Sequence, residues 1–370
     1  MKFLPLITFV FAILAPNASA SDDDLFMRKG LETLYLQEAE KYLACRQEKK
    51  VRCNSSEVEG FLELLEIKLP VERVSLTYPN AAQRSGHAAE VVTELTISSS
   101  GLVENVEVLS CQSGFGDTDL KHEWRIDGRH CGKFELAAEE GLTSFKFPAF
   151  PAELLTVPRK IRWKATFALM GRTSHDVNAQ MTDLTSRQIK TVKKFAESKN
   201  WAALEEYALE NLDESNVFHY YAADSALMLG KIPLAIDRFT KFLKTGGRSY
   251  WHFGVKAAVL VIPHYYEVGN DKEVVDLVKK SLLEKYLYEG NVITKTAVAD
   301  VLLKYASSLT LIEQPEIAEA LLTLRNIKRH QRLHGDLPDG LLDMVNQQIM
   351  HLESQIIAIG RSKVDTAPAT

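Results

Sequence analysis

The feature that most constrains the fold is an alternation of apolar and polar residues along three short stretches. Residues 91–98 and 103–109 alternate on either side of a serine-rich turn, in which Gly101 is free to take a positive φ. Residues 161–169 alternate again, after residues 134–145, whose apolar side chains recur at helical spacing. Because a period of two is typical of strands with one buried face, the pattern predicts an antiparallel sheet of three strands.

Short motifs around these strands narrow the interpretation. A Tyr-Pro pair opens a helical turn before the first strand, where a proline costs no helical hydrogen bond. The helix before the last strand ends in an aromatic, basic and proline-containing segment. These motifs and the order of the elements resemble the C-terminal domain of the TonB energy transducers, over residues 70–170. The residues that match the family motifs are Tyr78, Pro79, Gly101, Phe147 and Pro148.

The resemblance implies an α+β domain with a three-stranded antiparallel sheet and two helices. It also implies a function, since in this family the last strand accepts a short extended peptide from an outer-membrane receptor. The corresponding edge strand here consists of Ile161, Arg162, Trp163, Lys164, Ala165, Thr166 and Phe167. Arg159, Lys160, Arg162 and Lys164 make this edge basic. The charges either attract a partner or protect the edge from aggregation, and the sequence leaves both readings open.

The chain departs from the family pattern by an insert between the second strand and the second helix. The chain contains four cysteines, and sequence position favours the disulfides Cys45–Cys53 and Cys111–Cys131, the second of which would close the insert. The alternative for the insert is a metal site made of Cys111, His122, His130 and Cys131. Its spacing fits no common zinc pattern, so we expect disulfides and neither a metal nor another cofactor.

Residues 1–20 have the composition of a signal peptide. Lys2 precedes an apolar run that is shorter than the ~20 residues of a membrane-spanning helix, and small residues precede a cleavage point between Ala20 and Ser21. We therefore expect a periplasmic protein of a Gram-negative cell envelope; the alternative is a protein anchored in the inner membrane and facing the periplasm. The net charge of −5 gives no reason to expect nucleic acid as a partner.

The remaining segments predict helices. Residues 21–69 predict an N-terminal helical segment, in which Ser56 and Glu59 predict a capping box. This segment is either a helical hairpin or the first part of a helical repeat. Residues 175–360 resemble tetratricopeptide repeats most clearly at Gly230, Ala235 and Phe239, with weaker similarity after Asn200-Trp201, Gly269-Asn270 and Gln314-Pro315. A helical bundle without repeats is the alternative. Residues 361–370 are polar and predict a flexible tail.

Catalytic motifs are absent from the sequence, so we expect no enzyme and no small-molecule substrate. Ser174, His175 and Asp176 are adjacent, and adjacent residues cannot form a triad. A cluster of basic residues late in the chain indicates either favourable pairing with a helix C-terminus or an anion site. Its members are Arg325, Lys328, Arg329, His330 and Arg332.

Three functions are compatible with this organisation. The first is a periplasmic protein-binding or scaffold protein, whose sheet domain docks an outer-membrane receptor or another envelope protein and whose helical repeats hold a second partner. The second is an energy transducer for outer-membrane transport, which needs a stiff proline-rich spacer, whereas residues 21–69 contain no proline. The third is a scaffold associated with peptidoglycan. The sequence favours the first.

Overall fold

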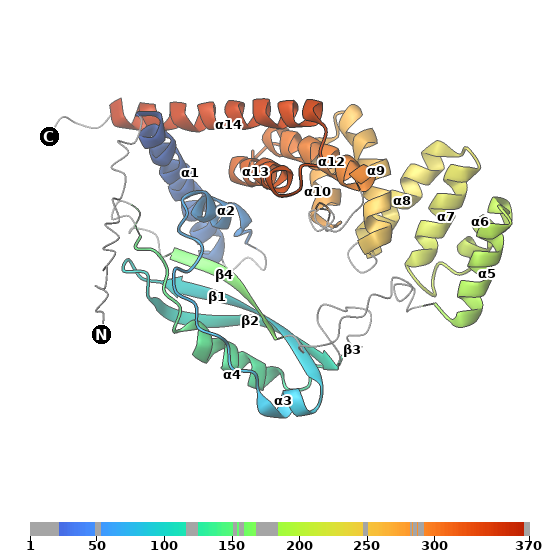
Figure 1. Cartoon of the computed structure of the whole chain (residues 1–370), viewed down its shortest axis with the longest axis horizontal. Coiled ribbons are helices and arrows are strands. Elements are labelled where there is room, and N and C mark those ends of the chain that lie inside the picture. The colour runs from blue at the N-terminus through green and yellow to red at the C-terminus, as the bar shows by residue number, and fades with distance from the viewer. Residues whose placement is uncertain are drawn as a thin grey trace, which may run out of the picture.

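A small antiparallel sheet and a long series of helices make up the protein (Figure 1). The computed structural model describes residues 22–48, 53–115, 125–150, 154, 159–167, 184–246, 251–281, 283, 287 and 292–365. The predicted α+β class is confirmed. The predicted signal peptide with its cleavage point, and Ser174, His175 and Asp176, lie outside the described residues.

The sheet has four strands, and not the three that the sequence predicts. They are β1 (His87–Ile97), β2 (Val103–Phe115), β3 (Arg125–Ile126) and β4 (Arg159–Phe167), in the spatial order β3-β2-β1-β4. The additional strand, β3, comes from the insert and pairs with the end of β2. Two residues are too few to produce a visible alternation, which is why the pattern did not predict this strand.

Two helices accompany the sheet, as predicted: α3 (Asn80–Arg84) before β1 and α4 (Cys131–Leu142) before β4. Helix α4 covers one face of the sheet with Phe134, Ala138 and Leu142, which recur every four residues and are fully buried. The Phe134 ring lies 5.0 Å from that of Phe167 on β4 and 5.6 Å from that of Tyr78. The core of this domain therefore joins α4, β4 and the segment before α3.

Gly101 is required by the hairpin turn between β1 and β2. Its φ is +88°, and a Cβ atom at this position would lie 2.0 Å from the carbonyl oxygen of Phe147. The Phe147 amide in turn donates a hydrogen bond of 2.8 Å to the Gly101 carbonyl. The hairpin turn thus packs directly on the segment that leads towards β4.

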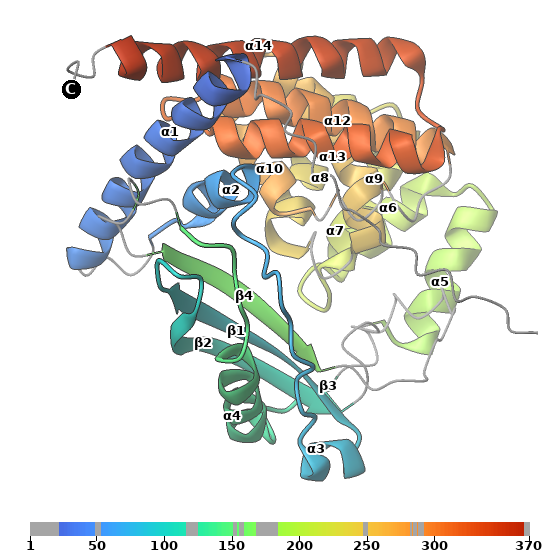
Figure 2. The same ribbon diagram turned by 60° about the vertical axis from the view of Figure 1, so that its left-hand side comes forward.

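The N-terminal helices form a hairpin that packs against the end of the chain. Helices α1 (Asp22–Gln47) and α2 (Ser56–Leu64) are joined by the Cys45–Cys53 disulfide, which the sequence favoured. Helix α1 crosses α14 (Asp339–Asp365), and α2 packs on α13 (Ile317–His334), as Figure 2 shows. The hairpin therefore packs on α13 and α14.

Two corrections concern helix ends. The N-cap of α2 is Ser55, whose side chain makes no capping hydrogen bond to the backbone, so the capping box predicted at Ser56 and Glu59 is wrong. Helix α14 continues to Asp365, and Arg361 pairs with Asp23 of α1 at 2.6 Å. The first half of the predicted flexible tail is therefore helical, while residues 366–370 lie outside the described residues.

The other helices pack in sequence order, each against the next. They are α5 (Ser186–Glu197), α6 (Trp201–Glu210), α7 (Val217–Met228), α8 (Ile232–Gly246), α9 (Trp251–Glu267), α10 (Asp271–Lys279) and α12 (Val292–Leu311). None of the described helices is long and apolar enough to cross a lipid bilayer.

The same tight turn connects α5 to α6, α7 to α8 and α9 to α10. Each turn contains one residue with positive φ, namely Lys199 (53°), Gly230 (74°) and Gly269 (69°). In each, the amide of the following residue donates to a carbonyl five positions back, an arrangement typical of a helix end with a left-handed residue. Two of the three weaker repeat signals in the sequence coincide with these turns, whereas the segment at Gln314-Pro315 contains no residue with positive φ.

Candidate protein-binding edge of the sheet

Strand β4 lies at the edge of the described sheet, where the sequence predicted the partner-binding strand. It pairs with β1 along its whole length without a bulge, from Ala89 opposite Phe167 to Ile97 opposite Arg159. An edge strand presents one row of backbone amides and carbonyls that no strand of its own sheet fills. The predicted residues Ile161 to Phe167 all lie on this strand.

The side chains of β4 alternate between the core and the surface. Ile161, Ala165 and Phe167 are buried against the face that α4 covers. Trp163 points to the same side but is half-buried; its ring contacts those of Phe145 and Phe147, at centroid distances of 5.6 and 6.5 Å. The guanidinium of Arg73 lies over the Trp163 ring, 5.5 Å from its centre. Arg162, Lys164 and Thr166 are exposed on the other side.

A hydrogen bond of Trp163 shows which backbone groups face outwards. Its carbonyl accepts a 3.2 Å hydrogen bond from the hydroxyl of Thr93 on β1, so it points towards β1. Because the direction alternates along an antiparallel ladder, the amides and carbonyls of Lys164 and Thr166 point outwards. Within the described part of the chain, no hydrogen bond fills these groups of Lys164 and Thr166.

The basic residues of β4 are mostly neutralised inside the molecule. Lys160 pairs with Glu94 at 2.6 Å, and Lys164 pairs with Glu90 at 3.1 Å, both across the β1–β4 ladder. Burial alone would raise the pKa of Glu94, but hydrogen bonds from Lys160 and Tyr42 hold it below its ordinary value. These two lysines are therefore paired within the sheet.

Arg159 does not belong to the exposed edge, although the sequence placed it among the edge charges. Its side chain is fully buried, with the guanidinium 5.3 Å from the centre of the Phe147 ring and 5.5 Å from that of Phe150. It donates a 2.7 Å hydrogen bond to the carbonyl of Pro148. Burial lowers the pKa of Arg159 to about 10. The motif residues Phe147 and Pro148 thus hold the start of β4 and do not line the edge.

Tyr78 and Pro79 also support the strand from the core side. Pro79 is the N-cap of α3. The Tyr78 hydroxyl donates a 2.6 Å hydrogen bond to the carbonyl of His87, and the ring lies 5.8 Å from that of Phe167. The motif residues therefore position β4 and leave its outer backbone groups exposed.

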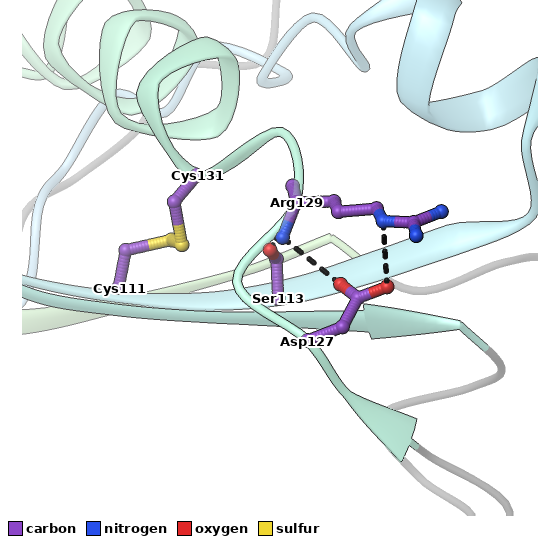
Figure 3. Close-up of a disulfide and its surroundings, with 5 residues drawn as sticks. All are labelled: Cys111, Ser113, Asp127, Arg129 and Cys131. Carbon is purple, nitrogen blue, oxygen red and sulfur yellow. Dashed lines mark hydrogen bonds and ion pairs between the residues drawn. A yellow bond between two sulfur atoms is a disulfide. The ribbon is translucent and has the colours of Figure 1, made fainter.

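The Cys111–Cys131 disulfide fastens β2 to the first residue of α4 (Figure 3). Next to it, the Asp127 carboxylate accepts a 2.9 Å hydrogen bond from the Arg129 amide and pairs with the Arg129 guanidinium at 3.5 Å. The Ser113 hydroxyl donates to the Arg129 carbonyl. These contacts hold the segment that enters α4.

The disulfide conflicts with the metal alternative for the insert. Both sulfur atoms are joined to each other, and the ring of His130 is directed to the Ser85 hydroxyl at 3.0 Å. His122, the fourth proposed ligand, lies outside the described residues. Glu135 is close to both sulfurs, but bonded sulfurs are not thiolate ligands.

The late basic cluster does not converge on one site. Arg325, Lys328, Arg329 and Arg332 are exposed, while His330 is buried and bonds to Asp336 at 2.8 Å. Arg325 pairs with Glu353 of α14 at 3.0 Å. The cluster therefore contributes to packing between α13 and α14, and an anion site finds no support in this arrangement.

One chain of polar residues was not predicted from the sequence. The Ser85 Oγ lies 3.0 Å from the Nδ1 of His87, whose Nε2 lies 3.1 Å from the Asp127 carboxylate. These distances fit a catalytic triad. The carbonyls of Ala81 and Ala82, which can only accept, also lie 3.0 Å from this hydroxyl and compete for its proton. The chain links α3, β1 and the segment before α4, and we interpret it as structural. No sequence signal relates Asp127 to His87, because they lie 40 residues apart.

The chain was also compared with known proteins, and no family model, curated protein or solved structure matches it. A functional assignment therefore depends on the geometry of β4 and of the helices around it.

Proposed function

We propose that this chain is a periplasmic, non-enzymatic protein-binding or scaffold protein that docks an extended segment of a partner protein by strand addition at β4. One observation carries the proposal: the outward amides and carbonyls of Lys164 and Thr166 on an edge strand. Each residue offers one donor and one acceptor to a partner strand. The partner in this proposal is an outer-membrane receptor or another protein of the cell envelope.

The TonB-like identity of the sheet domain belongs to this proposal. It is supported by the order α3, β1, β2, α4, β4 and by the close approach of Gly101 to Phe147. Gly101 and Phe147 are two of the motif residues on which the resemblance depends. The additional strand β3 departs from that pattern at the edge opposite β4.

The helical array is proposed to resemble tetratricopeptide repeats and to hold a second partner. Its three tight turns with one geometry support this, since they produce successive helix pairs of the same kind. Ala235 is buried on α8, where α7 and α8 pack, and the Phe239 ring lies 5.5 Å from that of Tyr220. These are the positions at which the sequence resembles the repeat.

The periplasmic location rests on the disulfides and on the signal-like composition of residues 1–20. Disulfides persist in oxidising compartments, and both pairs here are intact.

Photo-crosslinking in the native cell tests the docking proposal. A photoreactive amino acid in place of Lys164 is expected to capture one envelope protein. Thr166→Pro is expected to abolish the capture, because it removes an outward amide but no hydrogen bond of the β1–β4 ladder. The matched control, Thr166→Ala, retains the amide and the capture.

A second probe position controls for non-specific crosslinking. Asn105 is exposed on β2, away from the proposed edge, and a photoreactive residue there is expected to capture nothing specific. Equal capture from both positions, or capture from position 164 that survives Thr166→Pro, would rule out β4 as the docking strand.

A further inference from the structure

The first residue of β4 carries a buried positive charge without a counter-ion in the described chain. The Arg159 side chain is 1% exposed. Its Nη1 donates the hydrogen bond to the Pro148 carbonyl, whereas Nε and Nη2 are buried and make no hydrogen bond to any described residue. The rings of Phe147 and Phe150 face the guanidinium, but a ring supplies only a partial negative charge. Buried charges are ordinarily paired, because taking a charge out of water is costly.

The two unfilled nitrogens form one edge of the guanidinium plane. The Nε–H and one Nη2–H of an arginine point in nearly the same direction, and this pair of donors matches the two oxygens of a carboxylate. Arg159 is charged at neutral pH, since its pKa lies at about 10. A buried water would fill the hydrogen bonds and leave the charge uncompensated. The unfilled edge therefore fits an anion with two oxygens in one plane.

A second buried donor without a partner comes from α1. Tyr35 is fully buried, and its hydroxyl makes no hydrogen bond to a described residue. Its ring packs edge-on against that of Phe150 at a centroid distance of 5.8 Å, and the Arg159 guanidinium lies 5.5 Å from the centre of the same Phe150 ring. Burial raises the pKa of Tyr35 to about 12, so the hydroxyl keeps its proton and can donate it. Two unsatisfied side chains, from α1 and from β4, thus pack on one ring.

We propose that Arg159 and Tyr35 bind one small carboxylate ion, held by the Nε–Nη2 edge of the guanidinium and by the tyrosine hydroxyl. The ligand is a free ion of the size of formate or acetate, because both side chains are closed off from solvent and do not meet the end of a polypeptide. The bound ion joins α1 to the start of β4. The site lies on the core side of β4, so it is independent of strand docking at the outer edge.

NMR of the Arg159 side chain tests the site directly. The full protein is unfolded in urea with its disulfides intact and refolded in a buffer without carboxylates, which removes any ion acquired in the cell. Formate, added at constant ionic strength, is expected to move the Arg159 Nε–H proton resonance downfield until the site is saturated, as a charge-assisted hydrogen bond forms. Arg159→Lys identifies this resonance by its loss.

Two results of this titration would overturn the proposal. The absence of a shift with both formate and acetate would show that water alone fills the edge of Arg159. An equal shift with chloride would show that the site does not select a carboxylate.

Thermal unfolding of Tyr35→Phe distinguishes a ligand site from a structural contact. Without carboxylates, the variant is expected to melt no lower than wild type, because it loses a buried hydroxyl that has no partner. It is expected to bind formate about tenfold more weakly than wild type, since one hydrogen bond to a charged group is lost. Formate should therefore raise the melting temperature of the wild type more than that of the variant.

Tyr42→Phe is the matched control on the same helix. The Tyr42 hydroxyl already donates to Glu94 at 2.8 Å, so this variant should melt lower than wild type with and without formate, and should bind formate as wild type does. Equal formate affinity of wild type and Tyr35→Phe contradicts the proposal. A Tyr35→Phe variant that is destabilised without carboxylates also contradicts it, because the hydroxyl would then have a partner within the protein.

Discussion

At the scale of single residues, Glu57 predicts most clearly how the stability of the fold depends on pH. Burial raises its pKa from 4.5 to about 8; the Ala318 amide acts in the opposite direction, while Glu316, Glu38 and Glu319 add to the rise. A raised pKa means that the folded protein binds the proton more tightly than the unfolded chain. The contribution of Glu57 to stability is therefore complete below about pH 4.5 and is lost as the pH rises towards 8.

Glu57→Gln is expected to remove this pH dependence. The amide is neutral at every pH and still offers an oxygen to the Ala318 amide. The variant should melt at a higher temperature than wild type at pH 8.5 and show little gain near pH 4, as measured by thermal unfolding across this range. Glu63→Gln, at an exposed position, is the control. A wild-type minus variant difference that does not change with pH would show that the pKa of Glu57 is the same in the folded and unfolded states.

Trp163 tests the packing of β4 on its core side. The sequence placed this residue in a core strand, and the structure leaves it half-buried between Phe145, Phe147 and Arg73. Trp163→Ala is expected to lower the free energy of unfolding by about 3 kcal/mol, the lower end of the range for buried tryptophans. Urea denaturation measures this, with Thr166→Ala as a surface control expected to change stability by less than about 0.5 kcal/mol. Equal stability of wild type and Trp163→Ala would remove the residue from the core.

Sequence reasoning reached those residues whose role depends on near neighbours. Alternation identified the buried and exposed sides of β4, and the turn chemistry identified Gly101. It could not find the Ser85–His87–Asp127 chain, because only the tertiary fold brings Asp127 to His87. It also counted Arg159 as an edge charge, since no local pattern distinguishes a buried arginine from an exposed one.

At the scale of elements, the crossing of α1 and α14 depends on two glycines. A Cβ atom on Gly30 would lie 2.0 Å from the Ile356 carbonyl oxygen, and one on Gly360 would lie 1.9 Å from that of Phe26. The two backbones therefore approach more closely than any side chain allows. Neither glycine stabilises its own helix, because glycine inside a helix lowers stability by about 0.5–1 kcal/mol relative to alanine.

Alanine at either glycine is expected to force α1 and α14 apart. Gly30→Ala and Gly360→Ala should each lower the free energy of unfolding by about 2 kcal/mol, within the range for overpacked sites, as measured by chemical denaturation. Gly340→Ala is the matched control, because it lies on α14 with nothing within 4 Å of the added methyl group, and it should be neutral or stabilising. Equal changes in the free energy of unfolding in all three variants would show that Gly30 and Gly360 are not required for the close crossing of α1 and α14.

The helices themselves were predictable from apolar periodicity, and their partners were not. The apolar faces of α1 and α2 indicate that these helices are buried on one side, but an apolar face does not specify which element packs against it. The contact with α13 and α14 needs specific shape, provided by Gly30, Gly60 and Gly360. The sequence did not predict strand β3, because two residues are too few to show an alternation of apolar and polar side chains.

At the scale of the whole molecule, the first and last described helices, α1 and α14, cross each other, and α2 lies between this crossing and the sheet (Figure 2). Helix α2 contacts α13, where Glu57 accepts a hydrogen bond from the Ala318 amide.

The proposed location of the protein has a direct test in its mass. The protein isolated from the periplasm is expected to begin at Ser21 and to react with a thiol reagent only after reduction, because all four cysteines are paired. Intact mass spectrometry with and without reduction measures both. A mass that retains Met1 and the apolar run would indicate a membrane-tethered protein, and the energy-transducer alternative would then replace the scaffold proposal.

The most direct test of the central claim is amide hydrogen exchange along β4, with and without a bound peptide selected from a display library. In the free protein, Trp163 and Ala165, whose amides face β1, should exchange slowly, while Lys164 and Thr166 should exchange fast. Binding should make all four slow. If Lys164 and Thr166 are already protected in the free protein, or stay fast in the complex, β4 is not an open edge that accepts a strand.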